Sequence, residues 1–174
     1  MVTNSSELFP LVDKNGMTIG QATRKECHSG SFLLHPVVHL HIFNSKNELY
    51  LQKRSINKDI QPGKWDTSVG GHVDYGEEID HALLREASEE LGIADFTPIF
   101  IDKYIHTSAF ESELVYSFYT VYDGILSPDT VEISEGRFWT INELAESMDE
   151  DLFTSNFKQE FNQYIMQLEH IKKA

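Results

Sequence analysis

The chain has 174 residues, of which 40% are hydrophobic and 24% are charged, the composition of one globular domain with an ordinary core. Its 28 acidic residues outnumber its 14 basic ones, and the formal net charge is −14. Binding to a nucleic-acid backbone or an anionic membrane needs clustered lysine and arginine, so this charge argues against both as partners. A small anionic substrate remains compatible, provided that metal ions and a few local cations neutralise it.

The single cysteine, Cys27, excludes an intrachain disulfide. The first residues show no basic segment followed by an apolar run, and no run of about 18 apolar residues occurs, so neither a signal peptide nor a membrane-spanning helix is predicted. We expect one domain over residues 1–174 and a cytoplasmic location. Whether the chain forms a homodimer is left open by the sequence.

The first half of the chain predicts strands joined by tight turns. A hairpin is expected over residues 7–24, because its central turn contains Asn15 and Gly16, which accept positive φ angles. Hydrophobic alternation and turn residues then predict a brief helix over residues 22–29, strands over 37–44 and 49–54, a loop over 56–63 and a strand over 65–73.

The second half continues with strands and ends in helices. Strands are expected over residues 96–107, 114–122 and 135–139. A short helix ending near Met148 should have Thr140 or Asn142 near its N-cap, and Ser155 is expected to cap a last helix reaching about residue 172. The buried side of that last helix is predicted to consist of Phe157, Phe161, Ile165 and Leu168. Strands on both sides of an internal helix indicate an α/β sandwich.

The internal helix is predicted over residues 77–91. Gly71 and Gly76 bracket a short loop before it, and Gly92 stands where a left-handed residue would end it. Glu77 and Glu78 favour its N-terminus through the helix dipole. An apolar stripe is expected to face the core and consists of Ile79, Leu83, Leu84, Ala87 and Leu91.

Three carboxylates share the neighbouring edge of this helix, those of Glu86, Glu89 and Glu90, with Arg85 beside them. A solvated acidic face usually carries lysines four residues away that relieve the repulsion, and this edge has none. A bound cation is therefore favoured over a plain acidic surface. Mg²⁺ takes oxygen ligands, commonly one or two carboxylates with water and phosphate oxygens, so a diphosphate substrate would fit such a site.

The segment 71–93 resembles a complete Nudix box: Gly71, five residues, Glu77, seven residues, and then Arg85-Glu86-Ala87-Ser88-Glu89-Glu90-Leu91-Gly92-Ile93. The resemblance implies a single Nudix domain with the Nudix fold, an α/β/α sandwich with a mixed central sheet. It also implies a pyrophosphohydrolase that depends on Mg²⁺ or Mn²⁺, in which Arg85 orients the carboxylates. The metal ligands that it implies are Glu86, Glu89, Glu90 and the backbone of Gly71.

Five further residues form a weaker metal-binding candidate: His28, His35, His72, Glu111 and Glu113. His72 follows a double glycine, and Glu111 and Glu113 are two positions apart in an extended stretch, so these two side chains should point the same way. Nothing local fixes the long-range geometry of this set. The other histidines are expected in ordinary surroundings, with His81 and His170 facing solvent, His39 and His41 packed or at the surface, and His106 undecided.

Residues 34–44, 62–65 and 68–72 are similar to isopentenyl diphosphate isomerase, itself a member of the Nudix fold. In that family, residues at the places of these three histidines and two glutamates hold a metal. The isomerase also needs a catalytic cysteine before the Gly-His pair, where this chain has Gly70, and it lacks most of the acidic box that this chain keeps. The resemblance implies an isomerase-like scaffold with a hydrolase site, whose histidines either hold a second metal or shape the pocket.

Cations for a diphosphate are available at Arg24, Lys53, Arg54 and Lys58. Of these, Arg54 and Lys58 are placed similarly to the diphosphate-binding pair of the isomerase. Trp65 resembles a pocket residue of the same family, although a tryptophan ahead of a strand commonly belongs to the core.

The leading hypothesis is metal-dependent hydrolysis of a diphosphate linkage in a nucleoside diphosphate derivative or a similar small organic diphosphate. Glu89 or Glu90 could be the general base, and Glu111 or Glu113 is the alternative. Two other functions compete: isomerisation of isopentenyl diphosphate, and binding of a ligand without cleavage by a Nudix-type module. The missing cysteine argues against the first, and the complete box argues against the second.

Overall fold

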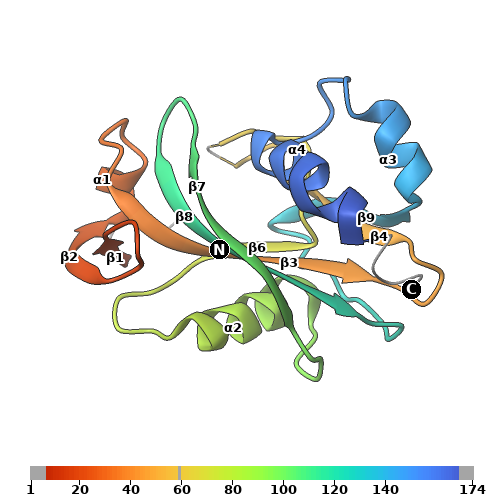
Figure 1. Cartoon of the computed structure of the whole chain (residues 1–174), viewed down its shortest axis with the longest axis horizontal. Helices are drawn as coiled ribbons and strands as arrows, with labels where there is room; N and C mark the ends of the chain where they lie inside the picture. Colours follow the sequence, from red (N-terminus) through yellow and green to blue (C-terminus); the bar gives the residue numbers. More distant parts are fainter. Residues whose placement is uncertain (1–6, 59, 169–174) are drawn as a thin grey trace.

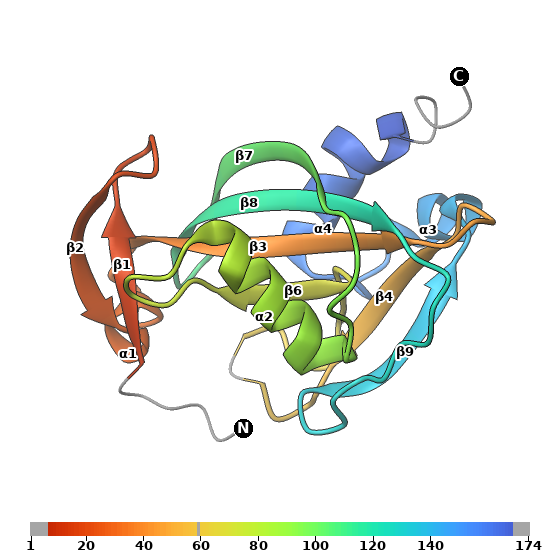
Figure 2. The same cartoon turned by 90° about the horizontal axis from the view of Figure 1, so that it is seen from below.

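A central seven-stranded sheet with helices on both faces dominates the computed structural model, which describes residues 7–58 and 60–168 (Figure 1). A separate two-stranded sheet lies at one end (Figure 2). In chain order the elements are β1 (Leu8–Val12), β2 (Thr18–Thr23), α1 (Arg24–Cys27), β3 (Leu34–Phe43), β4 (Leu49–Arg54), β5 (Trp65–Asp66), β6 (Val69–His72), α2 (Ile79–Leu91), β7 (Ile99–Thr107), β8 (Ser112–Val121), β9 (Ile133–Trp139), α3 (Ile141–Ser147), α4 (Ser155–Glu160) and the π-helix η1 (Phe161–Ile165). The predicted hairpin, brief helix and most strands are confirmed, with shifted ends.

Strand β3 lies at the centre of the large sheet. It pairs in parallel with β8 over its whole length, and β7 pairs antiparallel with β8 at the edge. On its other side β3 pairs with β6 through residues 37–40 and with β4 only at residues 42 and 43. Strand β4 then diverges to pair with β5 and β9. The mixed sheet of the expected sandwich is therefore confirmed.

Residues 65–73 form two strands, so the prediction of one continuous strand is wrong. Strand β5 pairs with β4, whereas β6 pairs with β3, and the chain changes partner at residues 67 and 68. There the Ser68 hydroxyl donates to the Tyr50 carbonyl at 2.5 Å and accepts the Ile42 N–H at 2.8 Å. One side chain thus satisfies buried backbone groups where β3 and β4 separate.

Helices cover both faces of the large sheet (Figure 1). Helix α2 packs on one face in a buried cluster with alternate residues of β3, and α3, α4 and η1 form a second cluster with β4 on the other face. The predicted inner side of the C-terminal helix is buried as expected. Leu84 was expected in the buried stripe of α2, which is wrong: it is 38% exposed, and Ala82 lies in the core instead.

Helix α2 begins two residues later than predicted, because Glu78 has an extended backbone and forms the N-cap. Its end is confirmed at Leu91, where Gly92 adopts the left-handed conformation with φ of 67°. The carboxylate edge therefore lies on a helix whose C-terminal end is set by Gly92 and whose N-cap residue makes no side-chain capping bond.

The C-terminal helices also begin at capping side chains. Thr140 caps α3 as expected, and Thr154 rather than Ser155 caps α4 by accepting the Phe157 N–H at 3.3 Å. The predicted end near residue 172 lies outside the described residues. No helix within residues 7–58 and 60–168 is long and apolar enough to cross a membrane.

Candidate metal and diphosphate site

Two cavities meet beside strand β6. The larger has a volume of about 330 Å³ and is bordered by the carboxylate edge of α2; we call it the acidic cavity. The smaller has a volume of about 90 Å³ and is bordered by His28, His39 and Glu111; we call it the histidine cavity. Residues that border both cavities form a common wall, which consists of Arg24, Arg54, Lys58, Gly70, Gly71 and His72.

Glu86 lies directly over the backbone of Gly71. A Cβ atom at residue 71 would overlap the Cγ, Cδ and Oε1 atoms of Glu86, so only glycine leaves room for this carboxylate. Burial raises the pKa of Glu86 to about 7, against the opposing effect of the Arg85 guanidinium. The glycine that opens the segment 71–93 therefore determines where the first carboxylate can lie.

Arg85 ties the acidic helix to the loop before it. Its Nε and Nη2 atoms each donate to one carboxylate oxygen of Glu77 at 2.9 Å. Nη2 also donates to the His72 carbonyl at 2.9 Å, and Nη1 donates to Glu86 at 2.7 Å. Bidentate pairing fixes the plane of the guanidinium, which in turn orients Glu86. Sequence reasoning assigned Glu77 only to the helix N-terminus and missed this pairing, although its fixed place in the motif was a signal.

The other two carboxylates of this edge differ in exposure. Glu90 is buried, and its Oε2 atom accepts from Gln52 Nε2 at 2.8 Å and from the Gly70 N–H at 3.2 Å. Burial, followed by the charge of Glu86, raises the pKa of Glu90 to about 8. The Glu89 side chain is 43% exposed and lies 3.4 Å from Arg85. Gln52 was not predicted, because nothing in the β4 sequence marks it as a partner of α2.

These carboxylates fit a divalent cation. Glu90 is buried and Glu86 is partly buried beside the acidic cavity, and desolvation raises the pKa of both carboxyl groups. A divalent cation would stabilise the negative charges of both carboxylates. The donors are all oxygen atoms, and such a set suits Mg²⁺ or Mn²⁺.

Four of the five residues in the second candidate set converge: the ligating atoms of His28, His35, His72 and Glu111 lie within 4.8 Å of one another. His28 Nε2 lies 3.1 Å from Glu111 Oε2 and 3.1 Å from His72 Nε2. His35 Nδ1 donates to the Leu33 carbonyl at 2.9 Å, which leaves Nε2 directed at Glu111. Within the described part of the chain, His35 Nε2 has no hydrogen-bond partner, and Glu111 Oε2 has only these imidazole nitrogens beside it.

The protonation states of this group also suit a metal. Burial, together with the positive charge of Arg24, lowers the pKa of His28 to about 3 and holds the pKa of His72 well below its usual range. Burial and the charge of Glu113 raise the pKa of Glu111 to about 8. Neutral imidazoles around a buried carboxyl group fit a divalent transition metal.

Glu113 lies outside this group of four. It borders the histidine cavity, but its Oε2 atom accepts from Asn156 Nδ2 at 2.9 Å. Helix α4 thus supplies a competing partner for this carboxylate, whereas Glu111, just before β8, is directed at the histidines. The structure brings Glu111 but not Glu113 into the expected ligand set.

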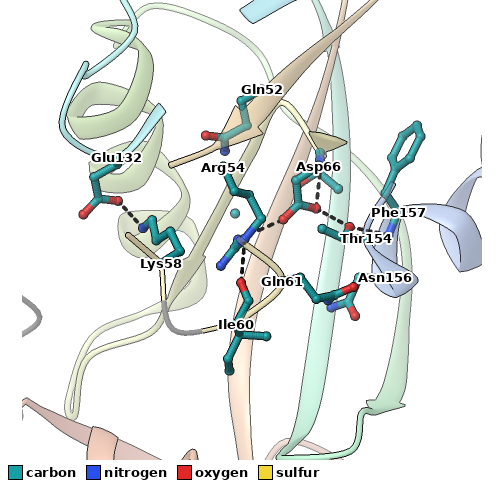
Figure 3. A network of polar contacts seen from close by, with 12 residues as sticks. Gln52, Arg54, Lys58, Ile60, Gln61, Asp66, Glu132, Thr154, Asn156 and Phe157 are labelled. Atoms are coloured by element: carbon teal, nitrogen blue, oxygen red, sulfur yellow. Dashed lines mark hydrogen bonds and ion pairs between the residues drawn. The ribbon is translucent and has the colours of Figure 1, made fainter. Parts of the chain in front are cut away.

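Arg54 and Lys58 lie in the common wall, as the sequence led us to expect of diphosphate-binding cations. Arg54 donates from Nη1 to Asp66 at 2.9 Å, and Asp66 accepts from the Thr154 hydroxyl at 2.8 Å (Figure 3). Lys58 pairs with Glu132 at 2.7 Å (Figure 3). These contacts hold both cations beside the two cavities and link Arg54 to the start of α4.

Trp65 borders neither cavity, so its expected role in substrate binding is not supported by the geometry. It is 7% exposed and packs edge to face on Trp139, with ring centroids 5.1 Å apart, in the cluster beneath the C-terminal helices. Lys53 also borders neither cavity and lies 3.7 Å from Glu135. Arg24 borders both cavities.

The remaining histidines are distributed as follows. His39 and His41 are packed, and both bind the buried Glu160, a partner that sequence reasoning missed because it lies far along the chain. His106 is buried and bonds to Gln159 at 2.8 Å. His81 is exposed, and His170 lies outside the described residues.

Comparisons with known proteins agree with this architecture. A family model described as the NUDIX domain matches residues 33–161. The chain is 34% identical over 159 residues to isopentenyl-diphosphate Delta-isomerase 1 of Photorhabdus laumondii, covering 87% of this chain and 90% of that protein. It is also 32% identical over 141 residues to an uncharacterized Nudix hydrolase of Pseudomonas aeruginosa, covering 78% and 79% of the two chains.

Among solved structures, a Deinococcus radiodurans protein superposes with a TM-score of 0.78 at 23% identity, covering 90% of this chain and 98% of that one, a likeness that concerns the fold. The matched residues 33–161 include the central strand β3, the acidic helix and most of the two cavities. The fold and the complete 71–93 motif thus agree with the family match, which covers most of the sequence. The chain belongs to the Nudix family.

Proposed function

We propose that the protein hydrolyses a diphosphate linkage in a nucleoside diphosphate derivative or a similar small organic diphosphate, with Mg²⁺ or Mn²⁺ as cofactor. One observation carries this proposal: the carboxylate edge of α2 and the cations Arg54 and Lys58 border the same cavity. A diphosphate offers oxygen atoms to a metal ion and to side-chain cations at once. The acidic cavity has carboxylates that could hold the metal ion and side-chain cations that could bind the phosphate oxygens.

Different residues of the chain would bind the metal ion, bind the diphosphate and position the carboxylates. The metal ion would be held by Glu86, Glu89, Glu90 and the Gly71 carbonyl. When bound, it supplies neutralisation of phosphate charge and a water molecule of lowered pKa. Arg54 and Lys58 bind phosphate oxygens and orient the diphosphate along the common wall. Arg85 is a positioning residue, because its guanidinium donates a hydrogen bond to Glu86 and so orients that carboxylate.

A general base must be accessible to water and ionised. Glu89 satisfies the first condition, since its side chain is 43% exposed and bordered by the acidic cavity. Glu90 is buried, and its Oε2 atom already accepts two hydrogen bonds. This difference favours Glu89 as the base and Glu90 as a metal ligand, with Glu111 or Glu113 as the alternative base from the histidine cavity.

The test is release of phosphate or monophosphate from a panel of nucleoside diphosphate derivatives and prenyl diphosphates, with and without Mg²⁺. Glu90→Gln should lower kcat by about 100-fold or more, because it removes a metal-binding charge. Glu146→Gln, the same change at an exposed position of α3, should leave activity intact. Equal rates for Glu90→Gln and wild type would refute the assignment. Tight, metal-dependent binding without turnover across the panel would indicate a binding module instead.

Isomerisation of isopentenyl diphosphate is the second candidate, because curated relatives carry that name and the four-residue histidine group is assembled. Gly70 argues against it, since it has no side chain that could move a proton at the position where the isomerase family has cysteine. We expect no solvent deuterium to enter isopentenyl diphosphate during incubation with the metal-loaded enzyme. Mass spectrometry of the recovered substrate checks this, and time-dependent incorporation would restore the isomerase hypothesis.

A further inference from the structure

A histidine pair on β3 shares one buried carboxylate beneath the histidine cavity. His39 Nδ1 lies 3.1 Å from Glu160 Oε2, and His41 Nε2 lies 2.9 Å from the same oxygen. Glu160 is fully buried at the junction of α4 and the π-helix η1. A carboxylate that holds one ring nitrogen fixes the orientation of the imidazole and thereby the direction of the other nitrogen.

Only one of the two histidines reaches the cavity. His39 borders the histidine cavity, whereas His41 borders neither cavity. A Cβ atom at Gly70 would stand 3.6 Å from His39 Cδ2 and 3.8 Å from Nε2. Because Gly70 has no side chain, nothing at that position covers the Nε2 edge of the ring. Among the described residues, no group is hydrogen-bonded to this nitrogen, so it is available to a ligand.

The charge of the pair supports a donor at this position. Burial alone would lower the pKa of His39, but the charge and hydrogen bond of Glu160 outweigh burial and raise it to about 9. Glu160 itself is held ionised, because the two histidines lower its pKa far below its usual range despite burial. Near neutral pH the His39 ring therefore carries a proton on both nitrogens, one directed at Glu160 and one at the cavity.

The lining of the histidine cavity disfavours a hydrocarbon group. Val37 and Ile60 are its only aliphatic members, and no phenylalanine, tyrosine or tryptophan borders it within the described chain. Asp66, Glu113 and Asn156 present polar atoms instead. A prenyl chain placed here would desolvate these groups without replacing their hydrogen bonds, and a nucleobase would lack an aromatic ring on which to stack. Hydroxyl groups would satisfy both donors and acceptors.

We propose that His39, positioned by Glu160, contacts the substrate directly and donates a hydrogen bond from Nε2 to an oxygen atom on its organic half. The organic half that enters the histidine cavity is then a hydroxylated group such as a sugar, and not a hydrocarbon chain. This inference rests on the proposed diphosphate hydrolysis, because the diphosphate bound at the common wall places the organic half in the smaller cavity.

Two matched variants separate substrate contact from structural effects. His39→Asn keeps an amide donor near the position of Nδ1, and so the bond to Glu160, but removes the Nε2 end. His41→Gln keeps a donor near the position of Nε2 and also retains its bond to Glu160. Both variants remove one imidazole from the same face of β3 and the same carboxylate. Only His39→Asn changes the cavity.

The rates are compared for UDP-glucose and ADP-ribose, whose organic halves are hydroxylated, and for isopentenyl diphosphate and geranyl diphosphate. We expect the hydroxylated pair to be the better substrates. His39→Asn should lower their kcat/KM by roughly 10- to 100-fold, the value of one hydrogen bond from a charged donor, while His41→Gln should change it by less than about threefold. Equal losses in the two variants, or a wild-type preference for the prenyl compounds, would overturn the inference.

Nuclear magnetic resonance distinguishes this inference from the proposed hydrolysis. Protein with ¹⁵N-labelled histidine is titrated with UDP-glucose in the presence of Mg²⁺, and the His39 signals are assigned by their loss in His39→Asn. A shift of His39 Nε2 with unchanged His41 signals is expected. Hydrolysis of UDP-glucose with no shift at His39 would refute the contact alone. A shift at His39 with no turnover of any compound would refute the hydrolysis and retain the contact.

Discussion

The position of Glu86 over Gly71 makes Gly71→Ala an informative substitution. The added methyl group would overlap three side-chain atoms of Glu86, but these belong to the far end of a flexible side chain and can move. Replacing glycine by alanine in extended backbone stabilises by about 0.4–1 kcal/mol through the unfolded state, and displacing Glu86 from its rotamer costs about 0.5–1.5 kcal/mol. The free energy of unfolding should therefore change by less than about 1 kcal/mol. The carboxylate, however, is driven from its place beside Arg85.

Metal binding should report that displacement. We expect Gly71→Ala to bind Mn²⁺ at least 10-fold more weakly, in line with the roughly 10- to 100-fold losses seen when a metal ligand is misoriented. Isothermal titration measures the affinity, and urea unfolding measures the stability. Gly70→Ala is the matched control in the same strand, because its methyl group would meet Thr67 Oγ1 at 3.3 Å and His39 at 3.6 Å without reaching Glu86. Gly71→Ala with wild-type Mn²⁺ affinity would show that Glu86 does not act from this position.

Three further predictions concern the same site. Without metal, burial raises the pKa of Glu90 from 4.5 to about 8, so between these two pH values the folded protein retains a proton that the unfolded chain has lost. Stability should therefore fall from about pH 4.5 to about pH 8, through this group by at most about 1.4 kcal/mol per pH unit. Urea unfolding in EDTA should show this slope, Mg²⁺ should oppose it, and Glu90→Gln should make it less steep, with Glu86 and Glu111 supplying the remainder through their own raised pKa values; an unchanged slope in the variant would contradict the assignment. Arg85→Lys should lose roughly 2–3 kcal/mol of unfolding free energy and weaken Mn²⁺ binding, because one ammonium group cannot serve Glu77 and the His72 carbonyl together; wild-type values would show that the bidentate contact is dispensable. Trp65→Phe should lower stability by roughly 1–3 kcal/mol with KM unchanged, and a large rise in KM with stability intact would return this residue to the substrate site.

Local chemistry explains which parts of the fold the sequence could reveal. The acidic helix was predictable because Gly92 must end it and because its apolar and acidic stripes recur at helical spacing. The hairpin over β1 and β2 depends on a turn with Asn15 and Gly16. The split between β5 and β6 was not predictable, since it depends on which distant strand each half meets. Ser68, whose hydroxyl bridges β3 and β4, gives no sign of that role in its own neighbourhood.

The same distinction holds for the site. The carboxylates of α2 share a helix face, so spacing alone indicated that they lie together. The histidine group needs the end of α1, β3, β6 and the loop before β8 to meet, so the residues alone made it only a weak candidate, which the resemblance to a family strengthened. The resemblance also placed Glu113 among the metal ligands, but Asn156 of α4 binds its carboxylate and it lies outside the group of four. Glu160 could not be assigned to His39 from any local pattern.

Strand β3 and its parallel neighbour β8 are separated in the chain by β4, β5, β6, α2 and β7. Parallel pairing over so long a connection is an intrinsically slow step in folding. During synthesis α2 with its carboxylates therefore emerges well before β8, whose Phe118 belongs to the buried cluster against which α2 packs. The moment at which β8 joins β3 should set when a newly made molecule first acquires its capacity to retain an ion.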